Sequence, residues 1–91
     1  MLSESGRIEK RTRVAMQVKL LILQNPGIVE KAKTENVSAH GARVVTTHPL
    51  PHQPLLLTSS EGKVQTYAQV VYCQRLADQS YAVGLQFESE A

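Results

Sequence analysis

Several residue types on which common functions depend are scarce in this 91-residue chain. Tryptophan is absent, cysteine occurs once, as Cys73, and aspartate occurs once, as Asp78. A single cysteine cannot form an intrachain disulfide, and one aspartate leaves paired-carboxylate catalysis to scattered glutamates. The histidines His40, His48 and His52 have no regular ligand spacing with acidic residues or with the cysteine. We therefore expect neither a metal site nor an enzyme.

Long hydrophobic runs and a strong net charge are missing as well. The aliphatic runs at residues 20–23 and 55–57 are far shorter than the roughly 20 residues of a transmembrane helix. Because the beginning of the chain is charged where a signal peptide would be apolar, we expect a cytoplasmic protein. The chain has ten basic and eight acidic residues, which gives a net charge of only +2. Three tyrosines and one phenylalanine are its only aromatic residues. Nucleic-acid binding by a small β-barrel is therefore the function that the sequence favours least.

The positive charge is concentrated near the N-terminus. Between positions 7 and 19 there are five basic residues and one acidic residue. The sequence predicts a basic N-terminal arm over residues 1–13, a β-barrel domain over 14–88 and a short acidic tail over 89–91. Since Ile8 is the arm's one apolar anchor, we expect this arm to be flexible without a ligand.

Apolar and polar residues alternate along most of the chain, which predicts strands and no helix. In the long segment that precedes the last turn, Val64, Thr66, Ala68, Val70 and Tyr72 are predicted to share one face. Clusters of turn-forming residues separate the strands. The predicted strands are residues 14–22, 28–34, 42–47, 55–58, 64–73 and 81–87. Six strands with short connections favour an antiparallel barrel or a sandwich, and we prefer the barrel because closure removes exposed sheet edges.

Two short patterns carry a more specific signal. The arm contains Arg7-Ile8-Glu9-Lys10-Arg11, an R-x-x-x-R pattern. The connection between the second and third predicted strands contains Asn36-Val37-Ser38-Ala39-His40-Gly41, an N-x-S-x-x-G pattern. The last predicted strand contains Val83-Gly84-Leu85-Gln86-Phe87. In this order, the three segments make residues 7–87 resemble the PilZ family, the bacterial receptor domains for the cyclic dinucleotide c-di-GMP.

The resemblance implies an all-β, six-stranded antiparallel Greek-key barrel of the split-barrel type. It also implies a non-enzymatic receptor for a second messenger, of the kind that regulates motility or biofilm formation. By the family's pattern, Arg7 and Arg11 clamp c-di-GMP from the arm, Asn36 bonds to a guanine edge and Ser38 bonds to a phosphate. Gly41 holds the backbone shape of the turn, because without a Cβ it can take a positive φ and let the ligand or the arm come close. Ordering of the arm by c-di-GMP then changes the affinity for an effector protein.

Each motif also has a plain structural interpretation. A basic arm is most often a solvated tail, and Asn36 and Ser38 taken alone are ordinary turn residues. Within the arm, Lys10 and Arg13 are additional candidates for part of the arginine role. The main alternative function is a PilZ-fold interaction module that does not bind the nucleotide, such as a pilus or flagellar adaptor. Neither interpretation calls for a resident cofactor or a membrane partner.

Overall fold

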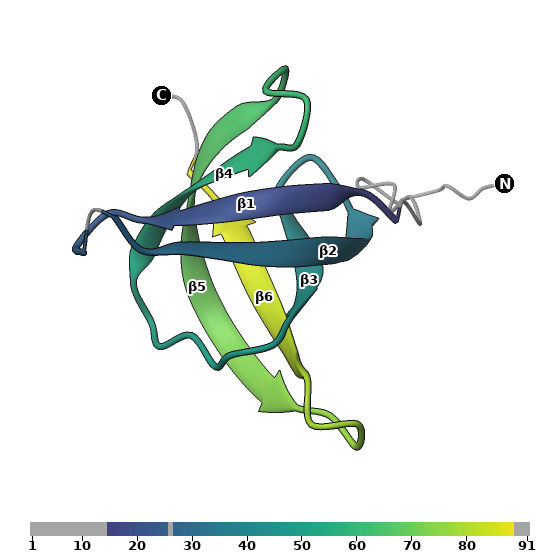
Figure 1. Cartoon of the computed structure of the whole chain (residues 1–91). Coiled ribbons are helices and arrows are strands. Elements are labelled where there is room, and N and C mark those ends of the chain that lie inside the picture. Colours follow the sequence, from purple (N-terminus) through teal and green to yellow (C-terminus); the bar gives the residue numbers. More distant parts are fainter. Residues whose placement is uncertain (1–14, 26, 89–91) are drawn as a thin grey trace, which may run out of the picture.

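The computed structural model describes residues 15–25 and 27–88, which form six strands and no helix. The strands are β1 (Gln17–Ile22), β2 (Val29–Val37), β3 (Gly41–Thr46), β4 (Pro54–Ser59), β5 (Gln65–Arg75) and β6 (Tyr81–Phe87). All neighbouring strands are antiparallel, and the order β1-β2-β3-β6-β5-β4 closes through the pairing of β4 with β1 (Figure 1). The predicted all-β barrel is therefore confirmed.

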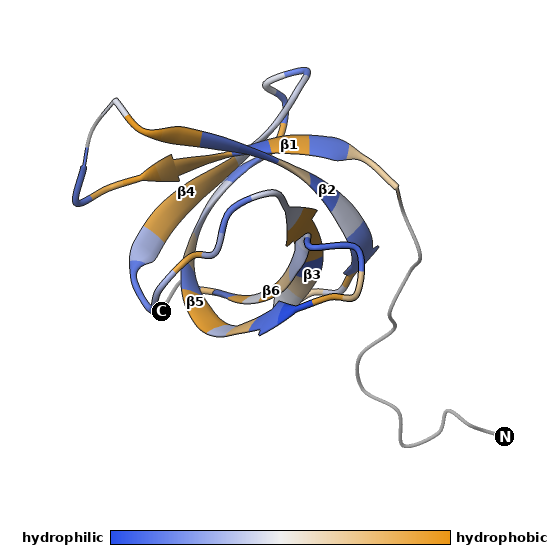
Figure 2. Ribbon diagram, turned by 60° about the horizontal axis from the view of Figure 1, so that its bottom comes forward, coloured by the Kyte–Doolittle hydropathy of each residue, from blue (hydrophilic) through white to orange (hydrophobic). Residues whose placement is uncertain are grey.

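One long connection gives the barrel its Greek-key order. Residues 47–53 carry the chain from β3 to β4, which leaves β3 beside β6, the last strand of the β4–β5–β6 meander. Pro49 and Pro51 lie in this connection, where their missing N–H groups interrupt no strand pairing. In the closed ring, β6 is three strands away from β1 in either direction, so these two strands form opposite walls (Figure 2).

Inward-facing aliphatic side chains fill the interior of the barrel. Leu20, Val44, Leu55, Val70 and Val83 are completely buried, and each comes from a different strand. Polar and charged residues alternate with the inward-facing residues along the strands, as the colouring in Figure 2 shows. Each such side chain contributes roughly 1.5–3 kcal/mol when it leaves water. The two-residue periodicity of the sequence thus becomes an inside and an outside of the barrel.

Two β-bulges change which residues face outward. The β2–β3 register shifts between Thr34 and Asn36, which leaves Glu35 as the extra residue. The β5–β6 register shifts between Val70 and Tyr72. The prediction that Tyr72 shares the inward face of Val70 is therefore wrong: Val70 is 0% exposed, whereas Tyr72 is 40% exposed. A bulge inserts one residue into the alternation and thereby reverses the side to which the following residue points.

The connection that contains the N-x-S-x-x-G pattern is shorter than the sequence predicts. Asn36 and Val37 belong to β2, because their pairing with Arg43 and Ala42 of β3 continues beyond the bulge. Only residues 38–40 lie between the two strands. The predicted arm, residues 1–13, and the predicted acidic tail, residues 89–91, lie outside the described residues. The described part of the chain contains no helix long and apolar enough to cross a membrane.

Candidate functional site

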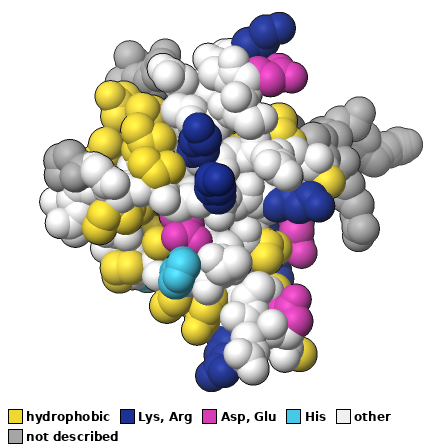
Figure 3. Space-filling model, viewed as in Figure 1, with side chains coloured by type: hydrophobic (Ala, Val, Ile, Leu, Met, Phe, Trp, Pro, Cys, Tyr) yellow, Lys and Arg dark blue, Asp and Glu magenta, His cyan; other side chains and the backbone are white. Residues whose placement is uncertain are grey.

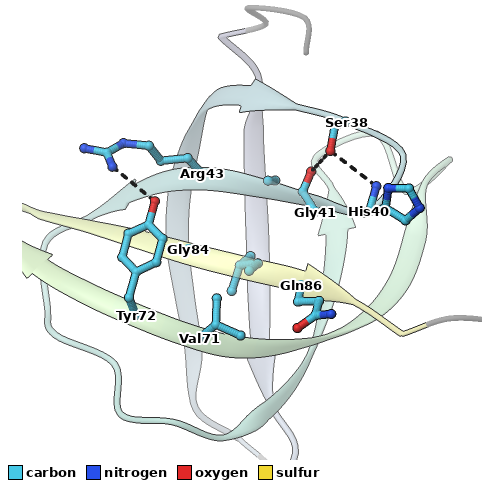
Figure 4. Close-up of a pocket in the computed structure, with 10 residues that line it drawn as sticks. Ser38, His40, Gly41, Arg43, Val71, Tyr72, Gly84 and Gln86 are labelled. Carbon is cyan, nitrogen blue, oxygen red and sulfur yellow. Dashed lines mark hydrogen bonds between the residues drawn. The ribbon is translucent and has the colours of Figure 1, made fainter. Parts of the chain in front are cut away.

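A pocket of about 290 Å³ opens on the outside of the barrel, where β3, β6 and β5 lie side by side (Figure 4). It contains backbone, hydroxyl, aromatic and guanidinium groups. The lining residues are Ser38, His40, Gly41, Ala42, Arg43, Val71, Tyr72, Gly84, Leu85 and Gln86. Two of the five residues to which the family's pattern assigns the ligand, Ser38 and Gly41, therefore lie in one pocket.

Gly41 allows two backbones to approach each other at the edge of this pocket. A Cβ at this position would overlap the carbonyl oxygen of Leu85 in β6, a backbone atom that cannot move aside easily. Gly41 does not have a positive φ, which among the described glycines occurs at Gly27 and Gly62. The predicted positive φ at Gly41 is therefore wrong, and the missing side chain serves close strand packing instead.

Ser38 closes the short loop and holds its hydroxyl at the pocket. Its backbone N–H donates to the carbonyl oxygen of Gly41 at 2.8 Å. Its Oγ donates to the same oxygen at 3.4 Å and accepts from the N–H of His40 at 3.3 Å (Figure 4). Both hydroxyl bonds are longer than the 2.5–3.2 Å typical of protein hydrogen bonds, so we expect a ligand to compete for this hydroxyl.

Asn36 lies next to the pocket but does not line it. It pairs with Arg43 across the β2–β3 ladder, immediately after the bulge at Glu35. The structure therefore brings Ser38 and Gly41 together and places Asn36 on the adjoining strand. A ligand larger than the pocket would have to extend over β2 to reach the Asn36 amide.

The chain enters the barrel close to this loop. The N–H of Met16 donates to Thr34 Oγ1 at 2.9 Å, and the N–H of Thr34 donates to the carbonyl oxygen of Met16 at 2.9 Å. Thr34 precedes Asn36 by two residues, so residue 16 lies at the end of β2 that leads into the Ser38 loop. The predicted ligand residues of the arm lie outside the described residues: Arg7, Lys10, Arg11 and Arg13.

Two residues of this pocket were missed from the sequence, Arg43 and Tyr72. Arg43 Nη1 donates to Tyr72 Oη at 3.1 Å, and the guanidinium carbon lies 5.9 Å from the centre of the ring. Arg43 Nε donates to Glu35 Oε1 at 2.7 Å. The hydrogen bond to Glu35, followed by the bond to Tyr72, raises the pKa of Arg43 above its ordinary value. The guanidinium is therefore a permanent cation beside an aromatic ring.

Gly84 makes room for the Tyr72 ring. The two residues pair across β5 and β6, and a Cβ at Gly84 would overlap the ring. The ring consequently lies over the backbone of β6, with its hydroxyl directed toward Arg43 (Figure 4). The bulge that exposes Tyr72 leaves no mark in the alternation of the sequence. The one available sequence signal for the position of Tyr72 was the glycine of the V-G-L-x-F segment, which leaves room for a large side chain such as tyrosine on a neighbouring strand.

The pocket combines the guanidinium of Arg43, which is ion-paired with Glu35, with an aromatic ring and a hydroxyl. Such groups suit a planar anionic ligand, because guanidinium bonds well to phosphate or a guanine edge and the ring can stack on a base. Within residues 15–25 and 27–88, no group of three or more metal-ligating side chains is gathered. Cys73 is exposed. The groups that the pocket offers are suited to binding.

The PilZ domain family matches residues 7–91, nearly the whole chain. The match includes the R-x-x-x-R segment, all six strands and the loop that closes the pocket. The chain therefore belongs to the PilZ family, a family of c-di-GMP receptor and adaptor domains. A comparison with curated proteins finds no match.

Proposed function

We propose that this protein is a c-di-GMP receptor and that the pocket between β3, β6 and β5 holds one part of the nucleotide. One observation carries the proposal: the Ser38 and Gly41 of a PilZ-family motif line the same pocket as the Arg43 cation and the Tyr72 ring. Anion binding and base stacking are the two interactions that a cyclic dinucleotide requires.

The residues of the pocket divide these tasks by their chemistry. Ser38 supplies a hydroxyl and Arg43 a guanidinium for a phosphate or for the guanine O6 and N7 edge. Tyr72 supplies a ring for stacking on a guanine. Asn36, on the adjoining strand, offers an amide to a guanine edge that extends over β2.

The size of the pocket implies that other groups complete the site. Its volume of about 290 Å³ lies just below the roughly 300–1,000 Å³ usual for ligand pockets. It therefore suits one base and a phosphate, and the rest of a dinucleotide must be covered by another segment. The arm joins the barrel near the Ser38 loop, so Arg7 and Arg11, with Lys10 or Arg13 as further cations, would supply that cover.

Nucleotide binding at this place would also change the surface offered to an effector. With the arm drawn over the pocket by phosphate contacts, one wall of the barrel would present the arm instead of β3, β6 and β5. The free energy for such a change comes from the arginine contacts that exist only in the bound state.

Isothermal titration of c-di-GMP into the purified chain tests the proposal, with GTP and a short single-stranded oligonucleotide as controls. We expect saturable binding of c-di-GMP at one or two nucleotides per chain and no binding of the controls. An absence of heat at high ligand excess, together with no thermal shift, would refute the receptor function.

The arm is tested by Arg11→Ala. We expect binding to weaken by more than about 1.5 kcal/mol, or roughly tenfold, because a charge-assisted bond to the ligand is lost. Arg75→Ala is the matched control, since it removes an exposed arginine at the C-terminal end of β5 that does not line the pocket. An unchanged dissociation constant for Arg11→Ala would remove this residue from the site and leave the pocket itself to be tested by Ser38→Ala.

A further inference from the structure

The outside of the barrel carries an apolar cluster on the wall opposite the pocket. It lies over β1, β2 and β4, whereas the pocket lies over β3, β6 and β5. On the side that Figure 3 shows, hydrophobic side chains gather toward the β1–β2 turn and basic side chains lie next to them. We call this surface the β1 face and define it by six residues: Lys19, Leu21, Leu23, Val29, Lys31 and Leu56.

Strand register makes the β1 face continuous. Leu21 pairs with Val29 of β2 on one side and with Leu56 of β4 on the other, so three aliphatic side chains form one row across the strands. Leu23 follows two residues beyond Leu21, and it is 41% exposed, as Val29 is 48% exposed. A soluble barrel gains nothing from gathering exposed aliphatic side chains in one place, and such patches generally mark interaction sites.

A basic row borders the aliphatic row. Lys19 pairs with Lys31 directly across the β1–β2 ladder, two residues from Leu21 and Val29. Among the described residues, neither lysine forms an ion pair. Like charges placed opposite each other on two strands are destabilising. The pair therefore weakens the barrel by itself, and a carboxylate supplied from outside would relieve the repulsion.

We propose that the β1 face is a docking site for an acidic amphipathic helix of a partner protein. Leucine-type side chains on one side of the helix would cover Leu21, Leu23 and Leu56. Glutamates along the margin of the helix would face Lys19 and Lys31. On this face β1 pairs with β2 on one side and with β4 on the other, so it offers no free edge to an extended peptide, and a partner must bind through side chains. A helix satisfies its own backbone groups and meets that requirement.

The charges of the β1 face disfavour the other occupants. In a symmetric dimer the face would meet itself, and the one carboxylate within β1, β4 and residues 29–33 is that of Glu30, which is 12% exposed and already bonded to Thr47 and His48, so it is poorly placed to receive the lysines of a second copy. The chain's own residues 1–14 carry four basic and two acidic residues, which is the wrong sign. Each lysine near an anionic membrane surface contributes only about 1 kcal/mol of binding free energy. The contribution of two lysines is too small to hold a protein there.

The proposal is tested by NMR titration of the ¹⁵N-labelled full chain with a synthetic helical peptide. The peptide has about 15 residues, enough for marginal helicity, with leucines at i, i+4, i+7 and i+11 and glutamates beside them. We expect saturable shift changes at the backbone amides of residues 19–23, 29–31 and 56. The same peptide with lysine in place of glutamate should leave these amides unchanged.

Charge reversal separates docking from folding, because exposed lysines can be replaced without disturbing the core. We expect Lys19→Glu combined with Lys31→Glu to weaken peptide binding by about tenfold or more, since two charge contacts become repulsive. Arg75→Glu is the control, because it reverses an exposed charge at the end of β5, and it should leave peptide binding unchanged. The double variant should still bind c-di-GMP as the unaltered chain does, since the pocket is on the opposite wall.

Four results would overturn the proposal. One is the absence of shift changes at these residues up to millimolar peptide, and another is equal binding of the lysine peptide. Co-sedimentation of the chain with vesicles of phosphatidylcholine and phosphatidylglycerol, lost in the lysine double variant, would assign the face to a membrane. A dimer in sedimentation velocity that Val29→Glu dissociates would assign it to a second copy. None of these results bears on c-di-GMP binding, so the two proposals fail separately.

Discussion

Tyr72 acquires its position from a bulge in its own strand and from two residues on other strands. The bulge after Val70 turns it outward, Gly84 leaves space for its ring, and Arg43 binds its hydroxyl. A tyrosine on a regular strand would rotate among several side-chain conformations in water. Here the ring is held over β6, which places a stacking surface in the pocket before any ligand arrives and reduces the entropy lost on binding.

The substitution Gly84→Ala tests this arrangement. The added Cβ would displace the ring, and we expect the free energy of unfolding to fall by about 1–2 kcal/mol. In a chain that already carries Tyr72→Ala the same substitution should be neutral or stabilising, because alanine is better than glycine in a strand without a ring to accommodate. Urea unfolding of the four chains gives both values. Equal losses in the two backgrounds would show that the ring does not depend on Gly84.

The β5–β6 turn shows how an element is terminated by local bonds. Its ends are joined by the N–H of Leu76, which donates to the carbonyl oxygen of Ser80 at 2.8 Å. Gln79 has a φ of 72°, a left-handed conformation that a long side chain rarely adopts. Ser80 donates from both its hydroxyl and its backbone N–H to the Asp78 carboxylate. These two bonds hold the turn together despite the unfavourable conformation at its centre.

The hydrogen bond from the Ser80 hydroxyl, and then the bond from its N–H, lower the pKa of Asp78 below its ordinary value. A carboxyl with a lowered pKa stabilises the folded state above its unfolded-state pKa, and this contribution disappears as the pH falls through the lower folded-state value. We expect Ser80→Ala to move the pKa of Asp78 upward toward its ordinary value. A ¹³C NMR titration of the carboxyl measures this, with Ser60→Ala as the control. A pKa that does not move would show that the hydroxyl bond is unimportant.

Closure of the barrel places the pocket and the β1 face on separate sides of the molecule. Because β1 and β6 lie on opposite walls, the pocket between β3, β6 and β5 and the β1 face do not overlap. The two walls nevertheless pack against one common core, to which all six strands contribute residues. A substitution inside the barrel should therefore affect both surfaces through stability, whereas a substitution outside should affect one.

Leu20 and Leu56 form a matched pair for testing this division. Leu20 is fully buried, and Leu56, at the β4 end of the aliphatic row on the β1 face, is only partly buried. We expect Leu20→Ala to lower the free energy of unfolding by about 2–5 kcal/mol, a large share of the roughly 5–15 kcal/mol available to a small domain. Leu56→Ala should lower it by less than about 1.5 kcal/mol. Similar losses in urea unfolding would mean that the β1 face is part of the core.

The sequence by itself determined the class of fold and the family. Alternation along the strands, with proline and glycine between them, was sufficient to predict six strands, since a two-residue period and turn chemistry are local properties. The order of the R-x-x-x-R and N-x-S-x-x-G patterns was sufficient to indicate the PilZ family. The sequence also brought attention to Ser38 and Gly41, which the pocket contains.

Only the tertiary structure decided which residues surround the pocket and which wall remains apolar. The bulges at Glu35 and before Tyr72 reverse the sides of the strands on which the following residues lie, and a bulge has no signature in alternation. Gly41 was predicted to need a positive φ, but its requirement arises from the backbone of β6, 44 residues later at Leu85. Residues on β3, β5 and β6 meet because β6 pairs with both other strands, and lysines on β1 and β2 face each other because of the register of that pair. Such juxtapositions depend on register between strands, which no local pattern specifies.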